Sequence, residues 1–285
     1  MTARPAATDL KHETMTLPSG SVSHIWQTNT TPARAVVVLQ HGFSEYAERY
    51  VDAHHSLIRE LNAANYTVYA LDLWGHGRSP GTRGVTHLGK AVEDHVHLRR
   101  LASKHGAPII LFGHSLGGLV TAGSATADSE NIKGVILTGP ALPDQFPGLA
   151  RAAIGLLARA MPTVSVPLPS AGLDGLTRDQ EEVKRFTSDP LVPQRQIPFL
   201  IAATALDTMQ KVNDGLKTWS LPTLVIHGTA DTYVLWKGSE KFVQGIASED
   251  KTLSRYDDGR HELLHDPPCA DEVFREILGW IDTHI

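Results

Sequence analysis

The sequence predicts an α/β fold with a mostly parallel central sheet, helices on both faces and a mostly helical insertion. The main observation is that short runs of apolar and β-branched residues alternate along the chain with longer segments of helical spacing. Connections of about a dozen residues or more join parallel strands, and right-handed crossovers place their helices over both faces of the sheet. The alternation stops between residues 141 and 204, which indicates an insertion into the sheet domain.

Each element is predicted from the spacing of its apolar residues, which is continuous or alternating in strands and 3.6-fold in helices. Ahead of the insertion, the predicted strands are residues 21–27, 35–39, 66–71, 108–112 and 133–137, and the predicted helices are residues 50–62, 89–105 and 116–127. After the insertion, the predicted strands are residues 222–227 and 251–256, and the predicted helices are residues 235–246 and 271–285.

The insertion is rich in proline and contains one strongly apolar helical segment, residues 149–161. Long insertions of this kind lie on the surface and are often lids over active sites. Residues 1–140 and 205–285 are therefore expected to form a core domain, with residues 141–204 as its cap. The apolar helix either packs onto the core, or covers an acyl tunnel and makes transient contact with a membrane or micelle.

The composition excludes several classes of protein. The 285 residues are 41% apolar and 20% charged, which is typical of a globular chain rather than a disordered one. The net charge of -5 is unsuited to nucleic acid as a partner, and the single Cys269 excludes an internal disulfide framework and a cysteine-ligated zinc site. The N-terminus lacks the apolar core of a signal peptide and no run of about 18 apolar residues occurs, so a cytoplasmic protein is expected.

The first candidate for chemistry is Gly113-His114-Ser115-Leu116-Gly117, which matches the pattern G-x-S-x-G. The pattern follows a predicted strand directly and opens a predicted helix, which is the context of a nucleophile elbow. The serine of such an elbow has a strained backbone and close neighbours, so glycine is needed on both sides. Ser115 is therefore the predicted nucleophile, and His114 is expected to be a packed residue of the elbow.

A serine hydroxyl needs a base to become nucleophilic. Among 15 histidines, His261 stands out because it lies in a polar loop after the last predicted strand. Asp231 follows the strand before it, and the carboxyl edge of an open sheet is where ligands bind. The chain order Ser115, Asp231, His261 is that of a triad built from strand ends. Asp257 and Asp258 remain alternative carboxylates.

An oxyanion hole needs two N–H groups beside the nucleophile. The segment His41-Gly42-Phe43 follows an early strand and is positioned to supply one of them. The predicted donors are the backbone N–H groups of Phe43 and Leu116, and the alternative is that His41-Gly42 is only a tight turn.

The sequence also contains a pattern typical of zinc proteases, H-E-x-x-H, in residues 261–265. Such a site needs both histidines on one face of a helix, and Asp266-Pro267-Pro268 leaves little room for that helix. His95 and His97 are two residues apart on a predicted helix and point to different faces. No phosphate-binding or dinucleotide-binding glycine motif is present. No metal or organic cofactor is therefore expected.

Together these residues resemble the α/β-hydrolase superfamily, and within it the monoacylglycerol lipase family, over nearly the whole chain. The segments that carry the resemblance are His41-Gly42-Phe43-Ser44-Glu45 with Arg49-Tyr50, Asp72-Leu73-Trp74-Gly75-His76-Gly77-Arg78-Ser79 with Gly81-Thr82-Arg83-Gly84, Gly113-His114-Ser115-Leu116-Gly117-Gly118, Asp189-Pro190-Leu191, His227-Gly228 with Asp231, and His261-Glu262. The resemblance implies an α/β-hydrolase fold and a serine hydrolase that cleaves monoacylglycerol into fatty acid and glycerol.

By the same resemblance, Ser115, Asp231 and His261 are nucleophile, acid and base, and Phe43 and Leu116 supply the oxyanion hole. The implied partner is a small lipid ester, with no cofactor.

Two residues depart from the family pattern. Tyr46 stands where the family usually has histidine, and Leu116 where it often has methionine; both adjoin the pocket.

Other activities remain open within this fold. A general carboxylesterase or a lysophospholipase would use the same triad, and a haloperoxidase-like esterase is less favoured because of the cap. Dehalogenases and epoxide hydrolases are disfavoured because their nucleophile is aspartate. A non-catalytic ligand receptor on a hydrolase scaffold usually has a broken triad, whereas all three members are present here.

Overall fold

A computed structural model describes all residues except 1–9, 29, 31, 143–147 and 168–171. Its centre is an eight-stranded sheet with the order β1-β2-β4-β3-β5-β6-β7-β8. The strands are β1 (Lys11–Thr16), β2 (Val22–Gln27), β3 (Ala35–Gln40), β4 (Tyr66–Leu71), β5 (Ile109–His114), β6 (Ile132–Thr138), β7 (Thr223–Gly228) and β8 (Lys251–Tyr256). β2 is antiparallel to both of its neighbours, and all other neighbouring pairs are parallel.

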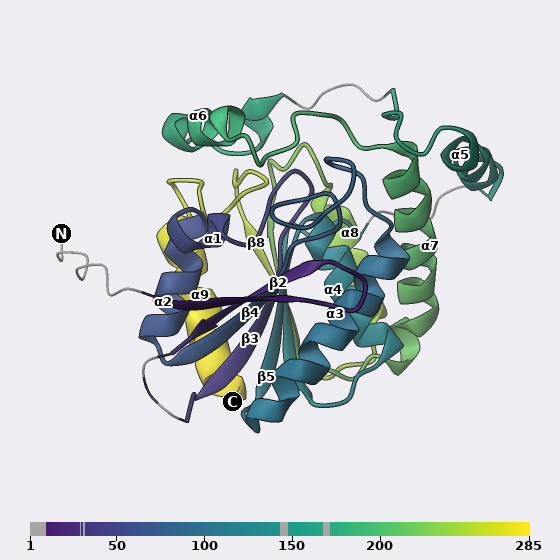
Figure 1. The fold of residues 1–285 in the computed structure, drawn as a ribbon. Helices are drawn as coiled ribbons and strands as arrows, with labels where there is room; N and C mark the ends of the chain where they lie inside the picture. Colours follow the sequence, from purple (N-terminus) through teal and green to yellow (C-terminus); the bar gives the residue numbers. More distant parts are fainter. Residues whose placement is uncertain (1–9, 29, 31, 143–147, 168–171) are drawn as a thin grey trace.

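Helices cover both faces of this sheet (Figure 1). They are α1 (Arg49–Asp52), α2 (Leu57–Ala63), α3 (Leu88–Ala102), α4 (Leu116–Ala127), α5 (Gly148–Ala160), α6 (Gln180–Ser188), α7 (Phe199–Gly215), α8 (Trp236–Gly245) and α9 (Ala270–His284). Because side chains alternate along a strand, β3 gives Val36 and Val38 to one apolar core and Val37 and Leu39 to the other. The first core includes residues of α3, α4, α7 and α8, and the second includes residues of α2 and α9. The predicted architecture, a mostly parallel sheet with helices on both faces, is confirmed.

The helix predicted for residues 50–62 is interrupted. His54, His55 and Ser56 have φ values of 48°, 58° and 54°, so the backbone turns between α1 and α2. This left-handed region is costly for residues with a side chain, and neither glycine nor proline marks the break in the sequence. The prediction of one continuous helix was wrong for that reason.

The inserted region holds α5 and α6, and Figure 1 shows both beyond the carboxyl ends of the strands. The expected boundary between cap and core, after residue 204, falls inside α7. This helix packs against α3 and α4 of the core and also against α5. The segment predicted as helix 149–161 agrees closely with α5. Within the part of the chain that the structure describes, no helix has the length and apolar character to cross a bilayer.

Candidate active site

Ser115 sits in a sharp turn between β5 and α4, with φ 53° and ψ −121°. Its backbone N–H donates to the Thr138 carbonyl at 3.0 Å, which ties the turn to the neighbouring β6. A Cβ on Gly117 would lie 2.3 Å from the carbonyl oxygens of Gln40 and His41. A side chain at that position therefore has no room, and the glycine of the motif is needed for the close approach of β3.

The three residues predicted from the sequence lie in hydrogen-bond contact. His261 Nε2 is 2.8 Å from Ser115 Oγ, and His261 Nδ1 is 2.6 Å from Asp231 Oδ2. Asp231 and His261 follow β7 and β8, so all three residues stand at the carboxyl edge of the sheet. Because the Asp231 carboxylate accepts a hydrogen bond from Nδ1, the proton of the neutral ring resides on Nδ1. The lone pair of Nε2 is then free to accept the Ser115 proton.

The surroundings of the pair raise the pKa of His261 and lower that of Asp231. Burial disfavours the charged imidazolium, but the carboxylates of Asp231, Glu262 and Glu45 outweigh it, so the pKa of His261 lies above 6.5. Burial also disfavours the Asp231 carboxylate, but its contacts with His261, His227 and the Val234 N–H lower its pKa. The lowered pKa keeps the Asp231 carboxylate ionised beside the His261 ring.

The segment His41-Gly42-Phe43 lies beside the nucleophile. A Cβ on Gly42 would be 3.1 Å from Ser115 Cβ. The segment is held by His41, whose Nε2 accepts the Leu73 N–H at 3.0 Å, and by Glu45, whose carboxylate accepts the Gly42 N–H at 3.2 Å. Leu116 is the first residue of α4, and the first N–H groups of a helix have no partner within it. The predicted Phe43 and Leu116 donors thus belong to segments on either side of Ser115.

The structure also places Asp258, one of the two alternative carboxylates, and His114. Asp258 pairs with Arg178 at 2.7 Å, so it is engaged away from the triad. His114 is buried against the Thr138 carbonyl at 3.0 Å, and burial lowers its pKa to about 4. It is a packed residue of the elbow, as its place beside the nucleophile suggested.

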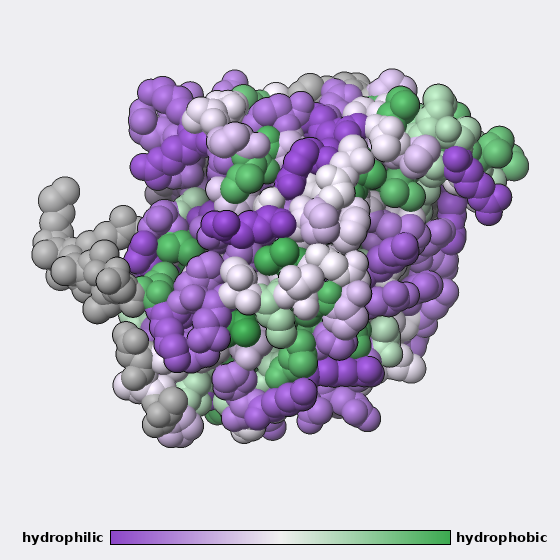
Figure 2. Space-filling model, viewed as in Figure 1, coloured by the Kyte–Doolittle hydropathy of each residue, from purple (hydrophilic) through white to green (hydrophobic). Residues whose placement is uncertain are grey.

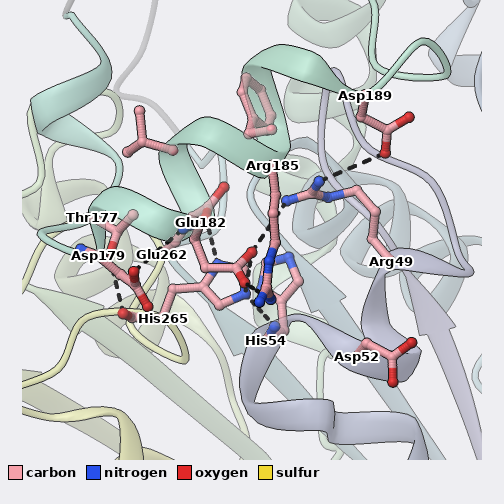
Figure 3. Close-up of polar contacts among 12 residues, drawn as sticks. Arg49, Asp52, His54, Thr177, Asp179, Glu182, Arg185, Asp189, Glu262 and His265 are labelled. Atoms are coloured by element: carbon pink, nitrogen blue, oxygen red, sulfur yellow. Dashed lines mark hydrogen bonds and ion pairs between the residues drawn. The ribbon is translucent and has the colours of Figure 1, made fainter.

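A polar cluster, mostly buried but with an exposed Arg185 side chain, lies between α6 and the core, and we call it the cap seam (Figure 3). Its members are Glu45, Arg49, His54, Glu182, Arg185, Asp189, Glu262 and His265. Arg49 is its central cation, 3.7 Å from Glu45 on the core and 3.9 to 4.0 Å from Glu182 and Asp189 of the inserted region. The core and the α6 region are therefore joined by buried charged side chains.

Among the residues that the structure describes, two groups of side chains have the types and spacing that could hold a metal ion: His12, His24 and Glu48, and His54, Glu262 and His265. In both groups, ring nitrogens already form hydrogen bonds within the protein, as between His12 and His24 at 3.0 Å and between His265 and Glu262 at 2.7 Å. Residues 261–265 form turns rather than a helix, and His261 is directed to Ser115 instead. The H-E-x-x-H letters thus do not form the helical zinc site that the pattern describes.

His227 and Tyr233 contact the triad, although the sequence pattern did not suggest a role for either residue. His227, at the end of β7, contacts Asp231 at 3.0 Å, and the Tyr233 ring stacks on His261 with centroids 5.3 Å apart. Tyr233 also donates its hydroxyl to the Gly172 carbonyl at 2.8 Å, which links the triad to the inserted region. His227 occurs in the His-Gly pair ahead of Asp231, but its spacing does not say where its ring points.

Comparisons with known proteins show which family the chain resembles. A family model described as serine aminopeptidase, S33 matches residues 31–268. The monoacylglycerol lipase of Mycolicibacterium smegmatis is 32% identical over 93% of each chain. The human monoglyceride lipase is 29% identical over 90% of this chain and 84% of its own.

A solved structure gives the same result. The crystal structure of Paleococcus ferrophilus monoacylglycerol lipase superposes with a TM-score of 0.80 and 33% identity, and covers 93% of this chain and 99% of its own. The chain therefore belongs to the α/β-hydrolase superfamily and, within it, to the monoacylglycerol lipase family.

Proposed function

We propose that this protein hydrolyses carboxylic esters of lipids, above all monoacylglycerols, through an acyl-enzyme on Ser115. The observation that carries the proposal is the chain of hydrogen bonds from Asp231 through His261 to Ser115, at 2.6 and 2.8 Å. Relatives that share most of this chain's length are named monoacylglycerol lipases, which supports the choice of substrate.

In the acylation step, His261 Nε2 takes the Ser115 proton as Oγ attacks the ester carbonyl. The backbone N–H groups of Phe43 and Leu116 stabilise the oxyanion of the tetrahedral intermediate. His261 then protonates the departing glycerol oxygen, which leaves the acyl group on Ser115. Asp231 keeps the imidazole in the productive tautomer and stabilises its positive charge.

In the deacylation step, His261 removes a proton from water, and the resulting hydroxide attacks the acyl carbonyl. The same two N–H groups hold the second oxyanion. Ser115 leaves and recovers its proton from His261, which releases the fatty acid. Each step uses side chains and backbone groups of this chain, without a cofactor.

We also propose that residues 141–204 form a cap that meets lipid surfaces transiently. Leu149 and Leu156 on α5 are 90% and 67% exposed, and Figure 2 shows apolar side chains gathered where α5 projects from the molecule. Leu235, after the Asp231 loop, is 69% exposed at the same end of the sheet. Exposed apolar side chains of this kind mark contact surfaces. Such contact would present amphiphilic esters to a cytoplasmic enzyme peripheral to the membrane.

The test is fatty-acid release from monoolein, with methyl oleate, diolein and lysophosphatidylcholine in parallel and Ser115→Ala as the blank. We expect a clear preference for monoolein and no turnover by Ser115→Ala or His261→Ala, although both variants stay folded by circular dichroism. Equal rates on methyl oleate would instead identify a general carboxylesterase. Turnover retained in either purified variant would refute the assignment of the triad.

A further inference from the structure

The acid of the triad has a second histidine partner. His227 is fully buried at the end of β7, and its Nε2 lies 3.0 Å from Asp231 Oδ2 and 2.9 Å from the Val234 carbonyl oxygen. Its Nδ1 lies 2.8 Å from Ser239 Oγ in α8. Both ring nitrogens are therefore engaged, one by the loop that carries the acid and one by the helix that follows.

These contacts fix where the proton of the His227 ring resides. Nε2 faces a carboxylate and a carbonyl, and both of these groups only accept hydrogen bonds. Nε2 must carry a proton in either protonation state of the ring. Nδ1 faces a hydroxyl, which can donate to a neutral ring or accept from a charged one.

Asp231 is consequently surrounded by donors. Its Oδ1 accepts the backbone N–H groups of Tyr233 and Val234 at 2.8 and 2.9 Å. Its Oδ2 accepts both His261 Nδ1 at 2.6 Å and His227 Nε2 at 3.0 Å. The oxygen that serves the catalytic base is the one that His227 also contacts, so the two rings share its negative charge.

We propose that His227 is a positioning residue of the triad, which fixes the Asp231 carboxylate and draws part of its charge away from His261. The inference rests on the proposed serine-hydrolase function and adds a fourth side chain to its machinery. His227 does not touch the reacting atoms, so its effect passes through Asp231.

A donor on a carboxylate lowers that group's affinity for protons, and so weakens its support for a neighbouring cation. Loss of the His227 donor should therefore leave more of the Asp231 charge to His261 and raise the pKa of His261. The other groups that raise this pKa are Glu262 and Glu45, while His114 and Tyr233 pack against the His261 ring. A substitution at residue 227 leaves these four side chains unchanged. A shift in the pKa of His261 therefore reports the loss of the contact between residue 227 and Asp231.

The experiment compares three single variants. His227→Leu removes the donor in a side chain of similar size. His227→Gln keeps a terminal N–H₂ group that can reach Asp231 and Val234. Ser239→Ala removes the contact on the far side of the ring and leaves Nε2 in place. For each variant, kcat/KM for p-nitrophenyl butyrate is measured against pH, because its acid limb reports the pKa of the free base.

In His227→Leu, we expect the acid limb to move to higher pH by about half a unit to one unit, a fraction of the shift that a full neighbouring charge causes. Its kcat should fall by far less than the roughly 10⁴-fold that follows replacement of the orienting aspartate. His227→Gln should restore the wild-type limb, and Ser239→Ala should keep it. An unshifted limb in a folded His227→Leu, or equal limbs in the Gln and Leu variants, would overturn the proposal.

A second readout separates this inference from the proposed function. The proton between His261 and Asp231 gives a far-downfield imidazole signal in the proton NMR spectrum, which needs no substrate. The signal should shift in His227→Leu and return in His227→Gln. If wild-type protein cleaved no ester and yet showed this response, the function would fail while the contact stood. Active wild-type protein with an unresponsive signal would refute the positioning role alone.

Discussion

Ser115 is held in a conformation that an isolated residue with a side chain avoids, with φ 53° and ψ −121°. Such strain persists only where the surroundings enforce it. Here the Ser115 N–H binds the Thr138 carbonyl, and the close approach of β3 to Gly117 fixes the other side of the turn. The strain lifts Oγ above the sheet edge, within 2.8 Å of its base.

At this scale, the first prediction concerns pH. The pKa of His261 is raised above 6.5, and only the neutral ring can accept the Ser115 proton, so kcat/KM should fall as pH drops through a midpoint above 6.5. Asp231→Asn should lower kcat by about 10⁴-fold because the ring loses its orienting charge. Both effects are measured with a soluble ester from pH 5 to 9, and the wild-type fold is checked at each pH. A wild-type midpoint well below 6.5 would contradict the electrostatics described above.

The meeting of Ser115, Asp231 and His261 at one edge of the sheet could be predicted from the sequence, because each follows a strand end. The second partner of Asp231 could not be, because the spacing of His227 gives its place on β7 but not the direction of its ring. The contacts of the cap seam could not be predicted from the sequence either. They join residues far apart along the chain: Arg49 and Asp189 are 140 positions apart, and His54 and His265 are 211 positions apart.

Among the elements, most of those with one apolar face were predicted well, whereas the polar β1 and α6 and the apolar α7 were missed. β1 is exposed along most of its length, so its sequence KHETMT gives no apolar alternation. α6 is QEEVKRFTS, polar on most of its surface, and the Asp179 side chain caps its first N–H groups. α7 begins directly after Pro198 in a proline-rich stretch that favoured loops. Their positions depend on tertiary contacts, which local periodicity does not record.

A prediction at this scale concerns how α6 is attached. Tyr46 replaces the histidine usual in the family, and its hydroxyl donates to Asp189 just after α6, at 2.7 Å. Tyr46→Phe removes this bond, which is worth about 1.5 kcal/mol for an acceptor that is charged. Backbone amides of α6 should then exchange with deuterium faster, by about tenfold. Tyr256→Phe loses a similar bond to Glu276 on α9 and should leave α6 unchanged; equal exchange in both variants would refute the attachment.

A further prediction concerns α5. Leu149→Glu and Leu156→Glu should weaken binding to monoolein-containing vesicles about tenfold or more, since burial of a leucine contributes about 1.5–3 kcal/mol. Turnover of a soluble ester should stay the same. Ile285→Glu makes the same chemical change at the C-terminus, which lies away from α5 in Figure 1, and should not alter binding. Vesicle sedimentation measures the effect, and equal losses in all three variants would argue against a lipid-facing α5.

For the whole molecule, stability depends on how closely the helices pack against the sheet. Gly134 of β6 leaves room for the ring of Trp280 on α9, because a Cβ there would lie 2.3 Å from that ring. Gly279, one residue earlier on the same helix, faces open space. The two glycines therefore have opposite roles: Gly134 permits packing, while Gly279 only loosens the helix.

This contrast predicts opposite effects of the same substitution. Gly134→Ala should lower the free energy of unfolding by about 1–3 kcal/mol, the usual cost of overpacking. Gly279→Ala should raise it by up to about 1 kcal/mol, because alanine favours the helix. Urea titrations followed by circular dichroism measure both values. A stability loss in Gly279→Ala equal to that in Gly134→Ala would contradict the packing of α9.

The site takes its serine from residue 115 and its base from a residue 146 positions later. During synthesis, a ribosome-bound chain therefore cannot be an active hydrolase until β8 and the loop after it have emerged. With the proposed triad, a chain truncated before His261 would lack esterase activity, however well its first strands pair. In refolding, esterase activity should return only after β8 has paired with β7, because His261 follows β8. The recovery of activity would therefore report when the sheet is complete.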